Sequence, residues 1–222
     1  MNNLIKLEKV YKIYNPGESE VHALDGISLK INKGEFIAII GKSGSGKSTL
    51  MNILGCLDIP TSGTYLLKDK NISEANDKYL SEIRNKEIGF IFQGFNLIPS
   101  LDSLENVELP LIYRGILKKE RRKLAREALI KVGLESRLHH KPSQMSGGQQ
   151  QRVAIARAIA SSPSIILADE PTGNLDSKSG DDIIRILTEL NELGKTVILI
   201  THDNKIAEKS KRVIRIMDGK IV

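Results

Sequence analysis

A glycine-rich segment directly after a predicted strand constrains this chain more than any other feature of its sequence. Residues 35–40 form an apolar run with branched side chains, and Gly41 to Thr49 then read GKSGSGKST. This segment matches G-x-x-x-x-G-K-[ST], in which glycines let backbone N–H groups converge on phosphate oxygens and the following helix adds its positive N-terminal end. A chance match is on the order of 1% in a chain of this size. The segment therefore predicts a nucleotide-binding loop between a strand and a helix.

Two side chains of this loop have specific chemistry. Lys47 is placed to reach the β- and γ-phosphates of a nucleotide, and the Ser48 hydroxyl is placed to ligate Mg²⁺. The residues expected to bind ATP are Gly41, Lys42, Ser43, Gly44, Ser45, Gly46, Lys47, Ser48 and Thr49.

Two carboxylates follow another predicted strand. Residues 165–168 run into Asp169 and Glu170, and parallel strands bring their carboxyl ends to the same edge of a sheet. Asp169 is then placed to hold Mg²⁺, directly or through water. Glu170 leaves the strand one residue later, where it can accept a proton from attacking water. Alone, such a pair is often a solvated turn; together with the phosphate loop it predicts a hydrolytic site.

The order of the apolar runs predicts an α/β fold over residues 1–222 as a single domain. Four runs have the length and branching of buried strands, at 35–40, 165–168, 196–200 and 213–217, and helical patterns lie between them. We expect a mostly parallel core sheet and, from 4–31 and 63–69, short antiparallel strands. The stretch from about 95 to 160 has no central strand, so we predict an inserted helical lobe. Its helical spacing is carried by Leu117, Leu124, Ala128, Leu129 and Val132.

Composition excludes several other classes of protein. No apolar run is long enough to span a bilayer, and the N-terminal charges argue against a signal peptide, so we expect a cytoplasmic protein. The net charge of +6 is concentrated at residues 114–127, which hold seven basic and two acidic residues. This segment is either a solvated helix face or a face turned toward an anionic membrane. With no Trp and 4% aromatic residues, no nucleic-acid partner is expected.

The remaining cysteine and histidine residues predict no metal site. The lone Cys56 is expected to be a small buried hydrophobic residue. His139 and His140 are adjacent and lack companion ligands, so we expect them in a loop.

Residues 145–152, MSGGQQQR, begin a second candidate phosphate-binding helix. Ser146 is placed as its N-cap, and the two glycines leave N–H groups open before an apolar stretch. The segment resembles the LSGGQ signature of ATP-binding cassette (ABC) ATPases, and the resemblance extends over essentially the whole chain. The phosphate loop, Gln93, the signature, Asp169 with Glu170, Asp176 in NLD and His202 in THD follow in the family's order.

The resemblance implies the P-loop NTPase fold of ABC ATPases, with ATP and Mg²⁺ as cofactors. Its core and antiparallel β subdomain would occupy 1–93 and 161–222, and its helical subdomain about 94–160. The family works as a head-to-tail pair, so the signature would contact ATP held by a second copy of the chain, which explains the otherwise redundant phosphate site. The signature residues that would make this contact are Ser146, Gly147, Gly148 and Gln149.

The resemblance also implies roles for single side chains. Gln93 would ligate Mg²⁺, sense the attacking water and couple the site to a membrane partner, and His202 would contact the γ-phosphate. Without the resemblance, they read as a polar residue at a strand end and as a capping residue. Asp176 would lie at the dimer interface. Adenine would stack on Tyr14, with Tyr11 as the alternative.

Three longer stretches, YNPGESEVHALDGISL, MNILGCLDIPTSG and FNLIPSLDSLENVELPL, resemble the MacB/LolD-like branch of bacterial ABC ATPases. Members of that branch pair with FtsX-like integral-membrane permeases. The resemblance implies a motor subunit, peripheral on the cytoplasmic face of the membrane, for peptide or macrolide export or resistance. Lipoprotein release is the alternative. A cytosolic ABC ATPase acting on nucleic acid fits less well, because 222 residues hold neither a long coiled coil nor a second cassette.

Overall fold

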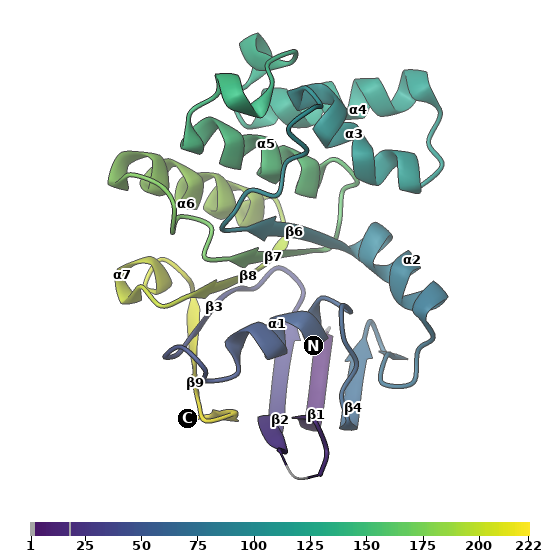
Figure 1. Cartoon of the computed structure of the whole chain (residues 1–222), viewed down its shortest axis with the longest axis vertical. Helices are drawn as coiled ribbons and strands as arrows, with labels where there is room; N and C mark the ends of the chain where they lie inside the picture. The colour runs from purple at the N-terminus through teal and green to yellow at the C-terminus, as the bar shows by residue number, and fades with distance from the viewer. Residues whose placement is uncertain (1–2, 18) are drawn as a thin grey trace.

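Two sheets organise the computed structural model, which describes residues 3–17 and 19–222 (Figure 1). The larger sheet has the order β10-β9-β3-β8-β7-β6, and all its neighbouring strands are parallel except the terminal pair β10 and β9. This arrangement confirms the predicted α/β fold with a mostly parallel core sheet. Its strands are β3 (Phe36–Ile40), β6 (Ile88–Phe92), β7 (Ile165–Asp169), β8 (Thr196–Thr201), β9 (Arg212–Met217) and β10 (Lys220–Ile221).

Strand β6 is an edge strand that the apolar runs did not reveal. It pairs in parallel with β7 and places Phe92 beside Asp169. Gly89 interrupts its apolar run, and the reason is packing: a Cβ on Gly89 would lie 2.4 Å from the backbone oxygen of Ala158. The glycine lets the signature helix approach the strand closely. It also interrupts the apolar run by which the strand would be recognised in the sequence.

The smaller sheet is antiparallel, with the order β2-β1-β4-β5. The prediction of short strands was wrong for its two main members, which are 12 residues long each. Register shifts interrupt their pairing at several points, so the inward-facing pattern is not a simple alternation. The strands are β1 (Asn3–Tyr14), β2 (Val21–Asn32), β4 (Ser62–Leu67) and β5 (Lys70–Asn71).

Helices cover the two faces of the core sheet differently (Figure 1). Helix α1 (Lys47–Leu54) and α2 (Asp77–Glu87) pack with the antiparallel sheet against one face. Helices α5 and α6 pack against the other, and α3 and α4 pack on α5. Alternate residues of β3 face opposite sides of the sheet. Ile37 and Ile39 lie in the core beneath α1 and α2, and the core on the other face contains Phe36, Ala38 and Ile40. The other helices are α3 (Ser103–Tyr113), α4 (Lys118–Lys131), α5 (Gly147–Ile159), α6 (Ser177–Glu192) and α7 (Asn204–Ala207), with short 3-10 turns at Glu135–Arg137 and Pro142–Gln144.

One of the residues at helical spacing in the lobe lies just outside α4 (Lys118–Lys131). Ala128, Leu129 and Val132 are buried, but Leu117 is 81% exposed and stands at the N-terminal boundary of α4. Helical spacing places a residue on a face of the helix, and this face is buried only where α3 and α5 pack against it.

Candidate functional site

The phosphate loop connects β3 to α1 and requires glycine at two of its positions. A Cβ on Gly41 would lie 2.4 Å from the backbone oxygen of Ile216, and one on Gly46 would lie 2.5 Å from that of Ala23. Gly46 also has a φ of +103°, a conformation that other residues rarely adopt. These contacts hold the loop against β9 and β2, so its backbone is shaped by the fold around it.

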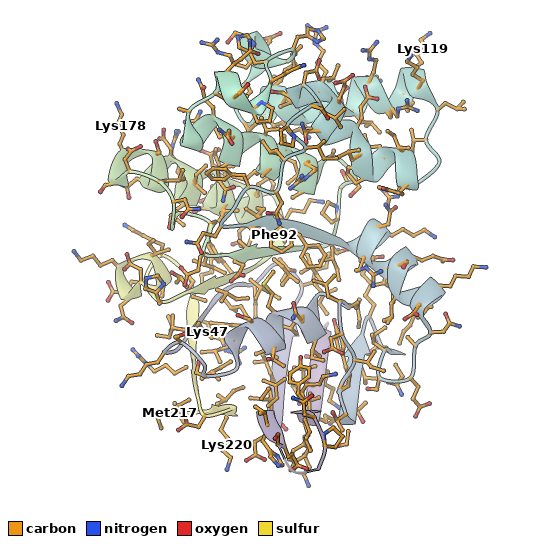
Figure 2. The ribbon with its side chains drawn as sticks, viewed as in Figure 1. Lys47, Phe92, Lys119, Lys178, Met217 and Lys220 are labelled. Atoms are coloured by element: carbon orange, nitrogen blue, oxygen red, sulfur yellow. The ribbon has the colours of Figure 1, made fainter. Side chains whose placement is uncertain are left out.

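Lys47 opens α1 and bends back over the loop (Figure 2). Its ammonium donates to the backbone oxygens of Gly41 at 2.7 Å and Lys42 at 2.8 Å. Ser48 follows at the exposed start of the helix. Inside the loop, the Ser45 hydroxyl is buried and has no hydrogen-bond partner among the described residues. A positive charge and open N–H groups therefore gather at the N-terminus of α1, where anions bind favourably.

Asp169 ends β7 close to this charge. Burial raises the pKa of Asp169, the neighbouring Glu170 carboxylate raises it further, and the ammonium of Lys47 opposes both effects. The structure thus brings Asp169 and Lys47 within electrostatic reach of each other, as the two strand ends predicted.

Glu170 leaves the strand through a sharp turn. Its φ of 44° lies in the left-handed region, which is strained for a side chain of this kind. The carboxylate accepts hydrogen bonds from the Thr201 hydroxyl at 3.0 Å and from the backbone N–H of His202 at 2.8 Å. His202 Nδ1 lies 2.6 Å from Glu170 Oε1 and must be the donor there, because a carboxylate only accepts. Glu170 and His202 are therefore one hydrogen-bonded pair at the end of β8.

Gln93 follows β6 directly and faces the loop after Glu170. Its side chain donates from Nε2 to Asn174 Oδ1 at 3.2 Å. The three oxygen-bearing side chains predicted to ligate Mg²⁺, those of Ser48, Asp169 and Gln93, thus come from the ends of three different elements. A hydroxyl, a carboxylate and an amide oxygen suit Mg²⁺, which prefers oxygen ligands and completes its shell with water and phosphate oxygens.

The signature segment forms the N-terminus of α5. Ser146 is its N-cap, as predicted: Ser146 Oγ accepts from the Gln149 backbone N–H at 3.3 Å, and Gln149 Oε1 accepts from the Ser146 N–H at 3.0 Å. A Cβ on Gly148 would lie 2.9 Å from Ser179 Oγ, so the start of α5 packs closely against α6. Gly147, the first residue of the helix, faces Leu175.

Asp176 caps α6 next to the signature. Its carboxylate accepts from the backbone N–H and from the hydroxyl of Ser179 at 3.0 and 2.7 Å, and these hydrogen bonds lower the pKa of Asp176. Ser179 in turn contacts Gly148. The negative charge of Asp176 is therefore held beside the start of α5.

The two candidate adenine-stacking residues have different surroundings. Tyr14 donates its hydroxyl to Asp58 at 2.9 Å, and burial together with Asp58 raises the pKa of Tyr14. The ammonium of Lys12 lies 5.0 Å from the centre of the Tyr14 ring. Tyr11 instead lies against Gly26, where a Cβ would be 3.1 Å from the Tyr11 hydroxyl oxygen.

The remaining sequence predictions concern structural residues. Cys56 is buried, as predicted, and burial raises the pKa of its thiol to about 11. His139 lies 3.0 Å from Asp102 and His140 lies 2.7 Å from Arg137, both before the turn at Pro142–Gln144.

Two residues of α5 that the sequence analysis did not single out hold the Gln93 segment in place. Gln151 donates to the backbone oxygens of Phe92 and Pro171 at 3.3 and 2.6 Å. Arg157 donates to the backbone oxygen of Phe95 at 2.9 Å and to that of Asn96. Gln151 is fully buried, so both hydrogen bonds are shielded from water.

Comparison with known proteins decides the family. The model of the family described as "ABC transporter" matches residues 24–173. The chain belongs to this family. As an ABC ATPase it is an ATP-binding and ATP-hydrolysing domain, which confirms the prediction of an ATPase.

The relatives of this ABC ATPase are of two lengths, one much longer than this chain and one about as long. The macrolide export ATP-binding/permease protein MacB of Hyphomonas neptunium is 55% identical over 219 residues, which are 99% of this chain and 34% of that protein. An ABC transporter ATP-binding protein of Thermotoga maritima is 52% identical over 221 residues, covering 100% of this chain and 94% of that one. YvrO of Bacillus subtilis is 55% identical, with coverages of 99% and 96%. The chain thus spans about a third of the MacB protein and nearly all of the other two.

Solved structures agree with this assignment. The dimeric post-hydrolysis structure of the ATP-binding cassette MJ0796 bound to ADP and Pi has a TM-score of 0.89 and 51% identity, and covers 98% of this chain and 96% of that chain. The structure of cbiO1 from Clostridium perfringens, part of the ABC transporter complex cbiONQ, has the same TM-score at 31% identity, with coverages of 100% and 88%. Within the described residues, no helix of the ABC ATPase is both long and apolar enough to cross a membrane.

Proposed function

We propose that this ABC ATPase is the motor subunit of a transporter, in which two copies close head-to-tail on two ATP molecules. The observation that carries the proposal is the position of its two phosphate-binding helix ends. Helix α1 packs on one face of the core sheet and α5 on the other (Figure 1). One chain cannot turn both N-termini toward the same phosphates, whereas a second copy can supply the missing one. The dimeric form of the MJ0796 cassette supports this pairing.

The chemistry follows from the side chains gathered at the sheet edge. Lys47 and the loop N–H groups would hold the phosphates, and Ser48, Asp169 and Gln93 would hold Mg²⁺, which offsets the phosphate charge. Glu170 would accept the proton of the attacking water, since its hydrogen bonds to Thr201 and His202 aim and fix the carboxylate. With Nδ1 bound to Glu170, a protonated Nε2 would make His202 a donor to the γ-phosphate.

Size-exclusion chromatography of a Glu170→Gln variant tests both pairing and catalysis. With Mg²⁺ and ATP the variant should elute as a dimer, and its ATP turnover should be at least 100-fold below that of the parent, because the proton acceptor is lost. The matched control adds Lys47→Ala, which removes phosphate binding and should leave a monomer. Hydrolysis at the parent rate would show that Glu170 is not the base, and a monomer with bound ATP would refute the pairing.

A groove beside Gln93 is the proposed contact with a permease. The groove has a volume of about 1010 Å³ and lies between α2, β6 and the helical lobe. Phe90 and Phe92, whose rings stack 5.7 Å apart, line its floor, and Tyr113, which is 85% exposed, stands at its rim. We expect a short amphipathic segment of an integral-membrane permease to bind there. Asn96 also lines the groove, so binding would act directly on the Gln93 segment.

The basic segment beside this groove is proposed to face the membrane. Glu108 forms ion pairs with both Arg121 and Arg122, but Lys118, Lys119 and Lys123 are exposed and have no ion pair among the described residues. Lys119 stands at an outer corner of the helical lobe (Figure 2). Such lysines attract anionic lipid headgroups. Changing all three to glutamate should abolish binding to anionic vesicles while leaving ATP hydrolysis intact; unchanged vesicle binding would refute this orientation.

The cargo is proposed from the relatives alone. The name of the Hyphomonas neptunium protein includes macrolide export, so we propose peptide or macrolide export through a MacB-like permease, peripheral to the cytoplasmic face of the membrane. Copurification from solubilised membranes with an FtsX-like permease would support this, and a partner of lipoprotein-release type would favour the alternative.

A further inference from the structure

Asn174 lies beside Gln93, although the two residues are far apart in the sequence. Asn174 Nδ2 donates to the backbone oxygen of Gln93 at 3.1 Å, and Gln93 Nε2 donates to Asn174 Oδ1 at 3.2 Å. Gly173 packs against the same side chain, because a Cβ there would lie 2.7 Å from Gln93 Nε2. The two hydrogen bonds and this close packing enclose the amide of Gln93 on one side.

These hydrogen bonds determine which way both amides face. A backbone carbonyl can only accept a hydrogen bond, so Asn174 must turn its NH₂ group toward the backbone oxygen of Gln93. The oxygen of Asn174 then faces the Gln93 side chain and requires a donor, which is Gln93 Nε2. The oxygen of Gln93, Oε1, is consequently the atom turned away from Asn174.

We infer that Asn174 is a positioning residue that presents Gln93 Oε1 to Mg²⁺. The inference rests on the proposed role of Gln93 as a magnesium ligand. Only the oxygen of an amide ligates Mg²⁺, and a Gln93 side chain rotated by half a turn would offer an NH₂ group instead. Gln93 is exposed, so without Asn174 its amide is free to rotate. Losing the partner that orients a metal ligand weakens metal binding roughly 10- to 100-fold.

The backbone around Gln93 is held by other residues. Gln151 bonds the backbone oxygen just before Gln93, and Arg157 bonds those of Phe95 and Asn96 just after it. Removing the Asn174 side chain therefore leaves the backbone of this segment in place and releases the side chain of Gln93. Asn174 is itself exposed, so its truncation should not disturb folding.

The test measures metal-dependent ATP binding in place of turnover. In a Glu170→Gln background, ATP affinity is measured by calorimetry across a Mg²⁺ titration and again in EDTA. Asn174→Ala should raise the Mg²⁺ concentration needed for half-maximal ATP affinity about tenfold and leave the affinity in EDTA unchanged. Gly173→Ala should act the same way, because its Cβ displaces Gln93 Nε2 while its backbone lies outside the left-handed region.

A double-mutant cycle separates positioning from a general effect on the loop. In a Gln93→Ala background, Asn174→Ala should cause no further change, since nothing remains to be oriented. An equal effect in EDTA, or a persistent effect without Gln93, would overturn the inference. If Gln93→Ala alone left the Mg²⁺ dependence unchanged, the proposed role of Gln93 would be wrong instead.

Discussion

The ionised side chain of Asp169 is expected to lower the folding stability of this ABC ATPase. A neutral amide at the same position would not. Burial and the charge of Glu170 raise the pKa of Asp169, and Lys47 offsets this only in part. A raised folded-state pKa means that the folded protein disfavours the ionised carboxylate, and an amide carries no such penalty. We therefore expect Asp169→Asn to increase the free energy of unfolding at pH 7.5 by about 0.5–2 kcal/mol, the usual range for a single stabilising substitution.

The pH dependence distinguishes this effect from ordinary repacking. Well below the unfolded-state pKa of about 4, the carboxyl group is protonated in both states and carries no penalty. As the pH rises through the folded-state pKa, the folded protein must ionise a half-buried group, and the penalty is complete above it. The stability gap between variant and parent should therefore be widest at neutral pH and narrow toward acid.

Urea unfolding from pH 5 to pH 8 measures this gap. Far-UV circular dichroism is the suitable probe, because the chain contains no Trp. Asp181→Asn is the matched control, since Asp181 is exposed on α6. An Asp169→Asn variant less stable than the parent at pH 7.5, or a gap that widens toward acid, would refute the reasoning. The stabilised variant should also lose Mg²⁺-dependent ATP turnover, because residues proposed to act in catalysis often lower the stability of the folded protein.

Four further substitutions test packing and nucleotide binding. Gly89→Ala should destabilise the fold by about 1–3 kcal/mol in urea unfolding, because its Cβ would lie 2.4 Å from the Ala158 backbone oxygen; an unchanged midpoint would contradict this. Tyr65→Phe removes the buried hydroxyl that donates to Leu54 O at 2.9 Å and should cost about 1–2 kcal/mol, whereas a neutral result would mean that water replaces it. Tyr14→Ala should weaken ATP binding about tenfold by calorimetry and Tyr11→Ala should not; the reverse order would reassign the stacking residue.

The central strands could be predicted because they are buried on both faces. Strands β3, β7 and β8 lie inside the sheet, so nearly every residue is apolar and the run is continuous. Strand β6 is absent from the four apolar runs because Gly89 admits the backbone of α5, a requirement set by a helix about seventy residues later in the chain. Leu117 continues the helical spacing but is exposed, because periodicity carries no information on where the neighbouring helices stop.

The candidate site likewise has parts that could be predicted from the sequence and parts that could not. The phosphate loop and the cap at Ser146 depend on consecutive residues, so their chemistry is visible in the sequence. The contacts of Asn174 with Gln93, and of Gln151 with Pro171, join loops at the ends of different elements. No periodicity or spacing relates such residues, and they meet only once the order of strands in the sheet is settled.

Several costs are concentrated at one edge of the core sheet, and their position explains how ATP binding can drive pairing. Burial and Glu170 raise the pKa of Asp169, Glu170 has a left-handed backbone, and the Ser45 hydroxyl is buried without a partner among the described residues. Mg²⁺ would relieve the first cost, but it leaves the strained Glu170 turn unchanged. A ligand shifts a conformational equilibrium only by its difference in affinity for the two states. Closure of the proposed dimer must therefore depend on contacts that a single chain does not make. The N-terminus of α5, on the opposite face of the sheet, is the element of this ABC ATPase able to supply them.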